Sequence, residues 1–182
     1  LLLTGDGPIV LDLIKLASEL GVANRIRFAG MLPDVKVAYA AMDSFLFLSR
    51  CEPFGLVLAE AMAAGVPVFG LAGEGGYNDP KFPLITPDNA VFIARRNPSR
   101  YDEPEAEDVL DQLASRIQDL DRQPWLYQGM IQNARKWVTH RFDAARQAAE
   151  VSGIYADVLR RTRGEDPRGR SDVVPGETLC RP

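Results

Sequence analysis

The chain has 182 residues, and 21 Lys and Arg against 25 Asp and Glu give it a net charge of −4. This balance argues against a nucleic-acid partner held by bulk charge. Hydrophobic residues make up 46% of the chain, as in soluble globular domains. No apolar run approaches the ~20 residues that span a bilayer, so we expect no integral membrane segment, while peripheral contact with a membrane stays open.

The chain contains two cysteines, Cys51 and Cys180. They are too few for a disulfide framework or a zinc site, so we predict no metal and a reducing, cytoplasmic setting. The first residues, Leu1 to Gly5, carry no initiator Met and no signal peptide. We interpret them as a strand already under way, in a piece of a longer protein.

Short apolar runs alternate with helical patterns over the first 71 residues. We expect strands at 1–3, 26–28, 44–48 and 66–71, and helices at 8–20, 34–41 and 55–64. In the first helix, Leu11, Ile14, Ala17 and Leu20 form a stripe that should face a core. Units of this kind predict an α/β fold with a mostly parallel sheet flanked by helices.

The alternation of strand and helix patterns becomes irregular after Ala72, and helical periodicity returns from residue 105. We expect a short strand at 90–93 and helices at 105–120, 124–140 and 143–160. The last residues, 161–182, lack periodicity and are predicted to be a disordered tail. The sequence therefore predicts one domain over residues 1–160.

The segment from Glu52 to Val68 is the strongest candidate for a binding site, because ligands of parallel sheets bind beyond the carboxyl ends of the strands. We expect a helix beginning after Gly55 to leave the NH groups of Gly55, Leu56 and Val57 unpaired, which creates an anion site. Glu60 lies ~6 to 7 Å further along the helix and can accept hydrogen bonds from the two hydroxyls of a ribose. As isolated residues, Glu52 and Glu60 would simply be solvated surface acids. However, a carboxylate in a helix this rich in Ala and Leu needs a partner or a pocket.

This segment closely resembles the signature of retaining glycosyltransferases of the GT-B fold, in particular family four. It has the form E-P-F-G-L-x-x-x-E-A-M-A-x-G-x-P-V, with seven residues between the two glutamates. The resemblance extends to the G-D-G-P turn at 5–8, the F-x-G turn at 28–30 and the segment 41–44. It covers about residues 1–160, and its motifs are concentrated in the first seventy.

The resemblance implies a Rossmann-like, donor-binding C-terminal half of a GT-B enzyme. Such an enzyme transfers a sugar from a nucleoside-diphosphate sugar to a hydroxyl acceptor. Glu52 would be the catalytic residue that contacts the transferred sugar, and Glu60 would bind the ribose. The remaining donor-binding positions would be the backbone at Phe54, Gly55 and Leu56, the base-binding loop at Met31 and Leu32, and Gly5 and Gly7 at the border of the cleft.

Neither a metal nor a cofactor is implied besides the nucleotide sugar, which is a substrate. The acceptor would be a glycan, a lipid or a small molecule bound by an N-terminal domain that this sequence does not contain. The family's basic residues that clamp the pyrophosphate also lie upstream of Gly5. We therefore expect the chain alone to bind nucleotide weakly and to transfer nothing.

The sequence departs from the family after Gly75 and Gly76, where Tyr77 to Pro80 replace the usual acidic residue and glycine-containing run. The role of this loop in selecting the donor is therefore left open. Two alternatives stay open: a non-catalytic module that binds nucleotide or a protein partner, and a GT-B-like nucleotide-sugar epimerase. The epimerase would need further acidic and basic catalytic residues.

Overall fold

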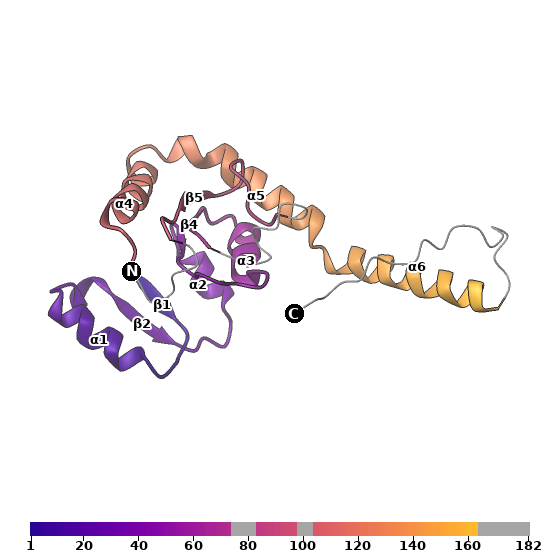
Figure 1. Ribbon diagram of the computed structural model, residues 1–182, viewed down its shortest axis with the longest axis horizontal. Coiled ribbons are helices and arrows are strands. Elements are labelled where there is room, and N and C mark those ends of the chain that lie inside the picture. Colours follow the sequence, from indigo (N-terminus) through magenta and orange to yellow (C-terminus); the bar gives the residue numbers. More distant parts are fainter. Residues whose placement is uncertain (74–82, 98–103, 164–182) are drawn as a thin grey trace. The chain divides into compact units, whose positions relative to one another are not determined.

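The computed structural model describes residues 1–73, 83–97 and 104–163. The chain divides into two compact units, Leu1–Arg141 and Phe142–Pro182 (Figure 1). The predicted domain over residues 1–160 therefore extends past the end of the first unit. The predicted tail over 161–182 lies almost entirely outside the described residues.

The first unit begins with a strand, a helix and a second strand. These are β1 (Leu2–Thr4), α1 (Val10–Glu19) and β2 (Arg27–Gly30), with a short 3₁₀ helix, η1 (Ala23–Arg25), before β2. The two strands pair in parallel, with Leu2 opposite Arg27 and Leu3 opposite Phe28. The predicted strand, helix and strand are confirmed.

A second parallel sheet follows in the same unit. Its elements are α2 (Lys36–Ala40), β3 (Phe45–Phe47), α3 (Leu56–Ala64), β4 (Val68–Ala72) and β5 (Val91–Ala94). The strand order is β3-β4-β5, so the strands pair in the order in which they occur along the chain and β4 is the central strand. The α/β class and the parallel pairing are as predicted, but the described strands form two sheets of two and three strands.

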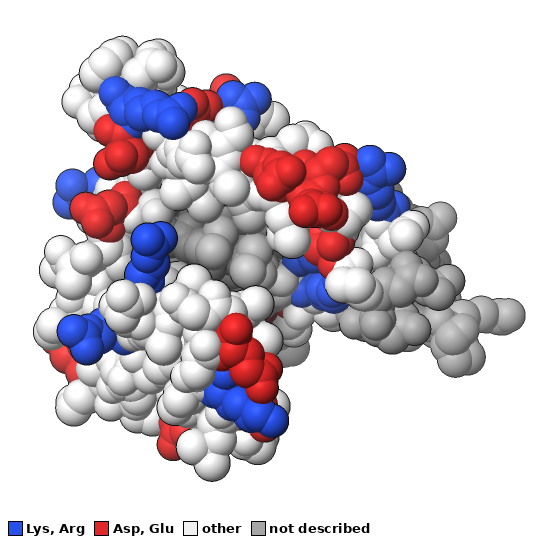
Figure 2. All heavy atoms as spheres, turned by 90° about the vertical axis from the view of Figure 1, so that its left-hand side faces the viewer, with Lys and Arg blue, Asp and Glu red and all other residues white. Residues whose placement is uncertain are grey.

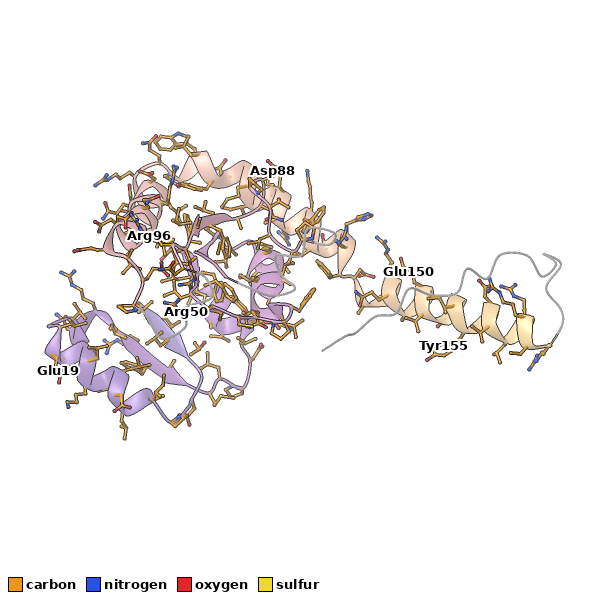
Figure 3. The ribbon with its side chains drawn as sticks, viewed as in Figure 1. Glu19, Arg50, Asp88, Arg96, Glu150 and Tyr155 are labelled. Atoms are coloured by element: carbon orange, nitrogen blue, oxygen red, sulfur yellow. The ribbon has the colours of Figure 1, made fainter. Side chains whose placement is uncertain are left out.

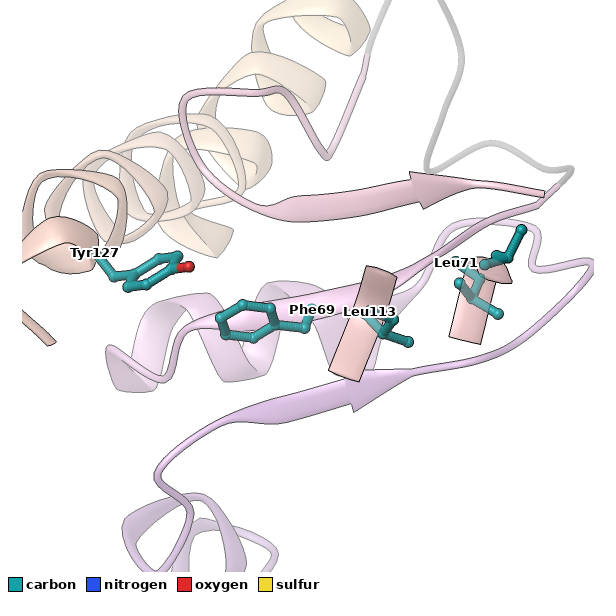
Figure 4. Close-up of a cluster of buried hydrophobic side chains, with 5 residues drawn as sticks. Phe69, Leu71, Leu113 and Tyr127 are labelled. Atoms are coloured by element: carbon teal, nitrogen blue, oxygen red, sulfur yellow. The ribbon is translucent and has the colours of Figure 1, made fainter. Parts of the chain in front are cut away.

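The core of the first unit lies against β4. Phe69 and Leu71 pack with Val109 and Leu113 of α4 (Glu107–Arg122) and with Tyr127 of the 3₁₀ helix η3 (Pro124–Tyr127), as Figure 4 shows. The rings of Phe69 and Tyr127 are 5.5 Å apart between centroids. Burial of these apolar side chains is the main contribution that fixes α4 on the sheet.

Helix α3 is buried on one side against α5 (Gln128–Arg141). Leu58, Ala61 and Met62 of α3 have no exposed surface, and a left-handed Gly65 ends the helix. In the view of Figure 1, the three-stranded sheet lies between α4 on one side and α3 and α5 on the other. This packing holds the N-terminus of α3 at the carboxyl end of β3.

The apolar stripe predicted for α1 is mostly wrong. Ala17 is buried, but Leu11, Ile14 and Leu20 are 78%, 41% and 65% exposed. A sheet of two short strands offers too little surface to cover a helix of ten residues. The pattern predicted the helix correctly but not the burial of its apolar face.

The second unit contains α6 (Ala144–Thr162), whose N-terminus is capped by Asp143 accepting a hydrogen bond of 2.7 Å from the Arg146 NH. No residue of this helix is buried. Figure 3 shows Glu150 and Tyr155 on opposite sides of the helix, as its amphipathic pattern requires. None of the helices within the described residues is long and apolar enough to cross a membrane.

Charged side chains of both signs are interspersed on the face drawn in Figure 2.

Candidate functional site

The N-terminus of α3 is the centre of the candidate site. Gly55 has φ +83°, a left-handed conformation that strains any residue with a side chain, and its position is buried. Its NH donates to Oε1 of Glu52 at 3.2 Å. The expectation that the Gly55 NH is unpaired is therefore wrong, because the nearby carboxylate caps it.

The next two NH groups are unpaired in the described part of the chain, as the predicted anion site requires. Within the described residues, the NH groups of Leu56 and Val57 have no hydrogen-bond partner, and both residues are exposed. The first turn of a helix carries about half a positive charge, which favours a bound anion. The half-buried carboxylate of Glu52 lies beside these NH groups. The NH groups favour a negatively charged ligand group, whereas the carboxylate favours positive charge.

Glu60 lies on the same helix and is exposed to solvent. Its Oε2 accepts a hydrogen bond of 2.8 Å from the hydroxyl of Tyr39, which comes from α2. The sequence predicts a partner or a pocket for this carboxylate. The partner is a buried tyrosine that lies 21 positions earlier in the chain. No motif predicted it.

The other predicted donor-binding residues follow β1 and β2. Gly5 has φ +111°, and its NH donates to the Gly30 carbonyl at 2.7 Å, which joins the two turns. Gly5 and Gly7 line a cavity of about 390 Å³ between α1 and the two strands. Met31 is 75% exposed and Leu32 is half-buried, so this loop presents apolar surface to solvent.

The structure thus places the predicted residues in two groups. One group follows β1 and β2, the other follows β3, and each lies at the carboxyl end of its parallel strands. No hydrogen bond within the described parts of the chain joins Gly5, Gly7, Met31 or Leu32 to Glu52 or Glu60. The predicted departure at residues 75–80 lies outside the described residues.

A buried ion pair supports the loop that carries Glu52. The Arg95 side chain, 3% exposed, donates to Oε2 of Glu105 at 2.5 Å and to the carbonyl of Leu48 at 2.7 Å. Arg50 approaches the same Glu105 oxygen at 3.9 Å (Figure 3). The two arginines and the glutamate therefore tie the end of β3 to the end of β5, a connection that no sequence spacing indicated.

Gly73, directly after β4, supports the loop from the other side. A Cβ at this position would lie 2.9 Å from the Ser49 carbonyl oxygen and would also overlap the backbone of Arg50. Only glycine allows so close an approach of the two backbones. The loop before Glu52 is therefore fixed by packing as well as by charge.

The described residues contain no group of three or more His, Cys, Asp and Glu placed to hold a metal ion. A metal-free reaction stays a prediction.

Residues 1–80 match the family described as glycosyl transferases group 1. The resemblance predicted from the E-P-F-G segment and the G-D-G-P turn is confirmed, and this part of the chain carries the sequence of that family. The fold agrees, because solved structures similar to the chain include glycosyltransferases of the GT-B fold.

Two of the proteins that share sequence with the chain illustrate the likeness. The N-acetyl-alpha-D-glucosaminyl L-malate synthase of Bacillus anthracis is 32% identical over 160 residues, which are 88% of this chain and 38% of the relative. The lipopolysaccharide core biosynthesis glycosyltransferase LpsE of Rhizobium meliloti is 45% identical over 73 residues, 40% of this chain and 22% of the relative.

Several solved structures share the fold, among them the following two. The Anabaena protein Alr3699/HepE, in complex with UDP and glucose, has a TM-score of 0.69 at 24% identity and aligns with 86% of this chain and 40% of its own. WaaG, a glycosyltransferase involved in lipopolysaccharide biosynthesis, has a TM-score of 0.61 at 25% identity, with 82% and 37% aligned. The chain spans about two fifths of the length of such proteins.

Proposed function

We propose that the chain forms the donor-binding domain of a retaining glycosyltransferase, which moves a sugar from a nucleoside-diphosphate sugar to a hydroxyl acceptor. The observation that carries the proposal is the N-terminus of α3. Two unpaired NH groups, at Leu56 and Val57, lie between a carboxylate at Glu52 and a second at Glu60. The NH groups suit the diphosphate of the donor, Glu52 suits its sugar, and Glu60 suits its ribose.

Each feature has a chemical role in this reaction. Negative charge grows on the diphosphate as its bond to the sugar breaks, and the NH groups and dipole of α3 offset that charge. The anomeric carbon becomes positive at the same time, and the carboxylate of Glu52 stabilises it electrostatically. The acceptor oxygen replaces the diphosphate oxygen on the anomeric carbon, and its proton passes to the released diphosphate or to water.

The capping bond from the Gly55 NH to Glu52 is part of this proposal. It holds the carboxylate at the helix end and uses the one NH group that the diphosphate would otherwise share. Leu56 and Val57 are left for the phosphate oxygens, together with backbone near Phe54. We propose that Met31 and Leu32 receive the base of the donor and that Gly5 and Gly7 lie at the border of the same cleft.

The relatives support the proposal. HepE is described in complex with UDP and glucose, and a pneumococcal O-GlcNAc transferase of similar fold, GtfA, in complex with UDP and GlcNAc. A cytoplasmic enzyme whose acceptor, a glycan, lipid or small molecule, binds to a separate N-terminal domain fits the family.

Calorimetric titration of the protein with UDP, GDP and ADP tests the donor site. We expect one diphosphate to bind saturably, and Glu60→Ala to weaken it about 10- to 100-fold, because two hydrogen bonds to a charged group are lost. Glu150→Ala is the matched control, an exposed helical glutamate of the second unit, and should leave binding unchanged. Failure of all three nucleotides at millimolar concentration, or an unaffected Glu60→Ala, would reject the proposal.

Turnover separates an enzyme from a nucleotide-binding module. The longest product that the gene encodes should release nucleoside diphosphate from the matching nucleotide sugar, and Glu52→Gln should abolish that release while nucleotide binding remains. Nuclear magnetic resonance of the product should show the anomeric configuration of the donor. Tight nucleotide binding without any release would favour the module.

A further inference from the structure

Tyr39 is a buried side chain that the proposed reaction does not use directly. It is 6% exposed, and its ring lies 6.1 Å from that of Phe45 between centroids. Its hydroxyl lies 2.8 Å from Oε2 of Glu60 and 3.4 Å from the carbonyl oxygen of Val57. The body of the side chain thus belongs to the core, while its polar end reaches the candidate site.

The shorter of these two contacts is the stronger hydrogen bond. A tyrosine hydroxyl carries one proton, so it cannot fully satisfy both acceptors at once. The carboxylate is charged and closer, and hydrogen bonds to charged acceptors are about twice as strong as neutral ones. The carbonyl of Val57 is a long secondary contact.

The surroundings of Tyr39 favour its protonated, hydrogen-bond-donating form. Burial raises the pKa of Tyr39 far above its ordinary value of 10.0, and the hydrogen bond and charge of Glu60 raise it further. The proton therefore remains on the tyrosine, and the carboxylate of Glu60 remains the acceptor.

This hydrogen bond restricts a flexible side chain. An exposed glutamate samples several rotamers, and fixing it in one of them costs side-chain entropy. Tyr39 restrains one carboxylate oxygen before any ligand arrives. The other, Oε1, has no partner within the described residues, and Oε2 keeps further acceptor capacity because a carboxylate offers about four acceptor sites.

We propose that Tyr39 is a positioning residue that holds Glu60 ready to accept hydrogen bonds from the two adjacent hydroxyls of a nucleoside ribose. The inference rests on the proposed function, because it assigns a role to Tyr39 at the same donor site. Tyr39 contacts the carboxylate and not the ligand, so its effect should be confined to ligands that carry the two hydroxyls.

Tyr39→Phe removes the hydroxyl and keeps the ring in the core. We measure the affinity of this variant for the diphosphate that binds the unaltered protein and for its 2′,3′-dideoxy analogue. We expect affinity for the ribonucleotide to fall about 3- to 10-fold, because the ligand must then fix the Glu60 side chain that Tyr39 otherwise restrains. Affinity for the dideoxy analogue should be unchanged, because Glu60 has no hydroxyl to bind there.

Tyr127→Phe is the matched control. Tyr127 is also buried, and its hydroxyl donates to the Arg116 carbonyl at 3.1 Å in a different part of the core. It should change neither affinity. A Tyr39→Phe variant that binds both ligands as tightly as the unaltered protein does, or that loses affinity for both equally, overturns the inference.

The double variant with Glu60→Ala separates the inference from the proposed function. If Glu60→Ala weakens ribonucleotide binding and the added Tyr39→Phe weakens it no further, Tyr39 acts through Glu60. Independent losses reject the positioning role and leave the donor site standing. Normal ribonucleotide binding by Glu60→Ala rejects both.

Discussion

The N-terminal segment, residues 1–30, and the central segment, residues 45–97, begin from the same kind of sequence and differ in burial. Each contains apolar strands followed by a glycine turn and a helix. In the central segment, Leu58, Phe69 and Leu71 are at most 2% exposed. In the N-terminal segment, Leu11 and Leu20 are more than half exposed. The apolar pattern therefore determines which element forms, whereas the burial of its apolar face depends on how many neighbouring elements cover that face.

Truncation of one leucine in each segment tests this comparison most strongly. Leu71→Ala should lower the free energy of unfolding by about 2 to 5 kcal/mol, because it opens a cavity between β4 and α4. Leu11→Ala should change it by less than about 0.5 kcal/mol, since that side chain is mostly solvated. Chemical denaturation measures both, and equal losses would show that the two segments are packed alike.

Two adjacent arginines sharpen the comparison for charged groups. Arg95→Ala should cost about 3 to 5 kcal/mol, because it leaves Glu105 buried without its main partner. Arg96 pairs with Asp108 on the surface and should be replaceable by Ala with little change in stability. Arg95→Ala should also weaken nucleotide binding, since Arg95 holds the carbonyl of Leu48 before the Glu52 loop. If the two variants lost the same stability, burial would not explain the greater effect expected at Arg95.

Two glycines extend the test to the backbone. Gly73→Ala should cost about 1 to 3 kcal/mol, because its Cβ would overlap the backbone at Ser49 and Arg50. Gly129→Ala, in α5, meets no atom within 4 Å and should stabilise the protein by about 0.5 to 1 kcal/mol. Thermal unfolding measures the stability of both variants. If Gly73→Ala left the stability unchanged, the loop at Ser49 and Arg50 would move aside at little cost.

The smallest expected effect is the pH dependence of the surface pair. The hydrogen bond from Arg96 lowers the pKa of Asp108 below its ordinary value of 3.8. The stability contributed by this pair is therefore present above that value and disappears as the pH falls through the lowered pKa. The difference in stability between the unaltered protein and Asp108→Asn should be slight at about pH 6 and should shrink as the pH falls below the lowered pKa of Asp108. A difference that grows in acid would contradict this sign.

Much of the candidate site could be predicted from local sequence. The Glu52 to Val68 segment predicted the start of α3 at Gly55, its end at Gly65 and the anion site at its first turn, because helix caps and glycine turns depend on neighbouring residues. The family resemblance followed from the same stretch. The predicted unpaired NH of Gly55 failed because the Glu52 side chain folds back onto it, a contact that spacing alone did not decide.

The sequence by itself determined the order of strands and helices, the parallel α/β class and the positions of both glutamates along the chain. These depend on periodicity, turn residues and motif spacing, which act over a few residues. Only the tertiary structure decided that Tyr39 meets Glu60, that Arg95 and Glu105 support the Glu52 loop, and that the apolar face of α1 stays exposed. Contacts between residues 10 to 47 positions apart depend on how the elements pack, and that packing is a property of the whole compact unit.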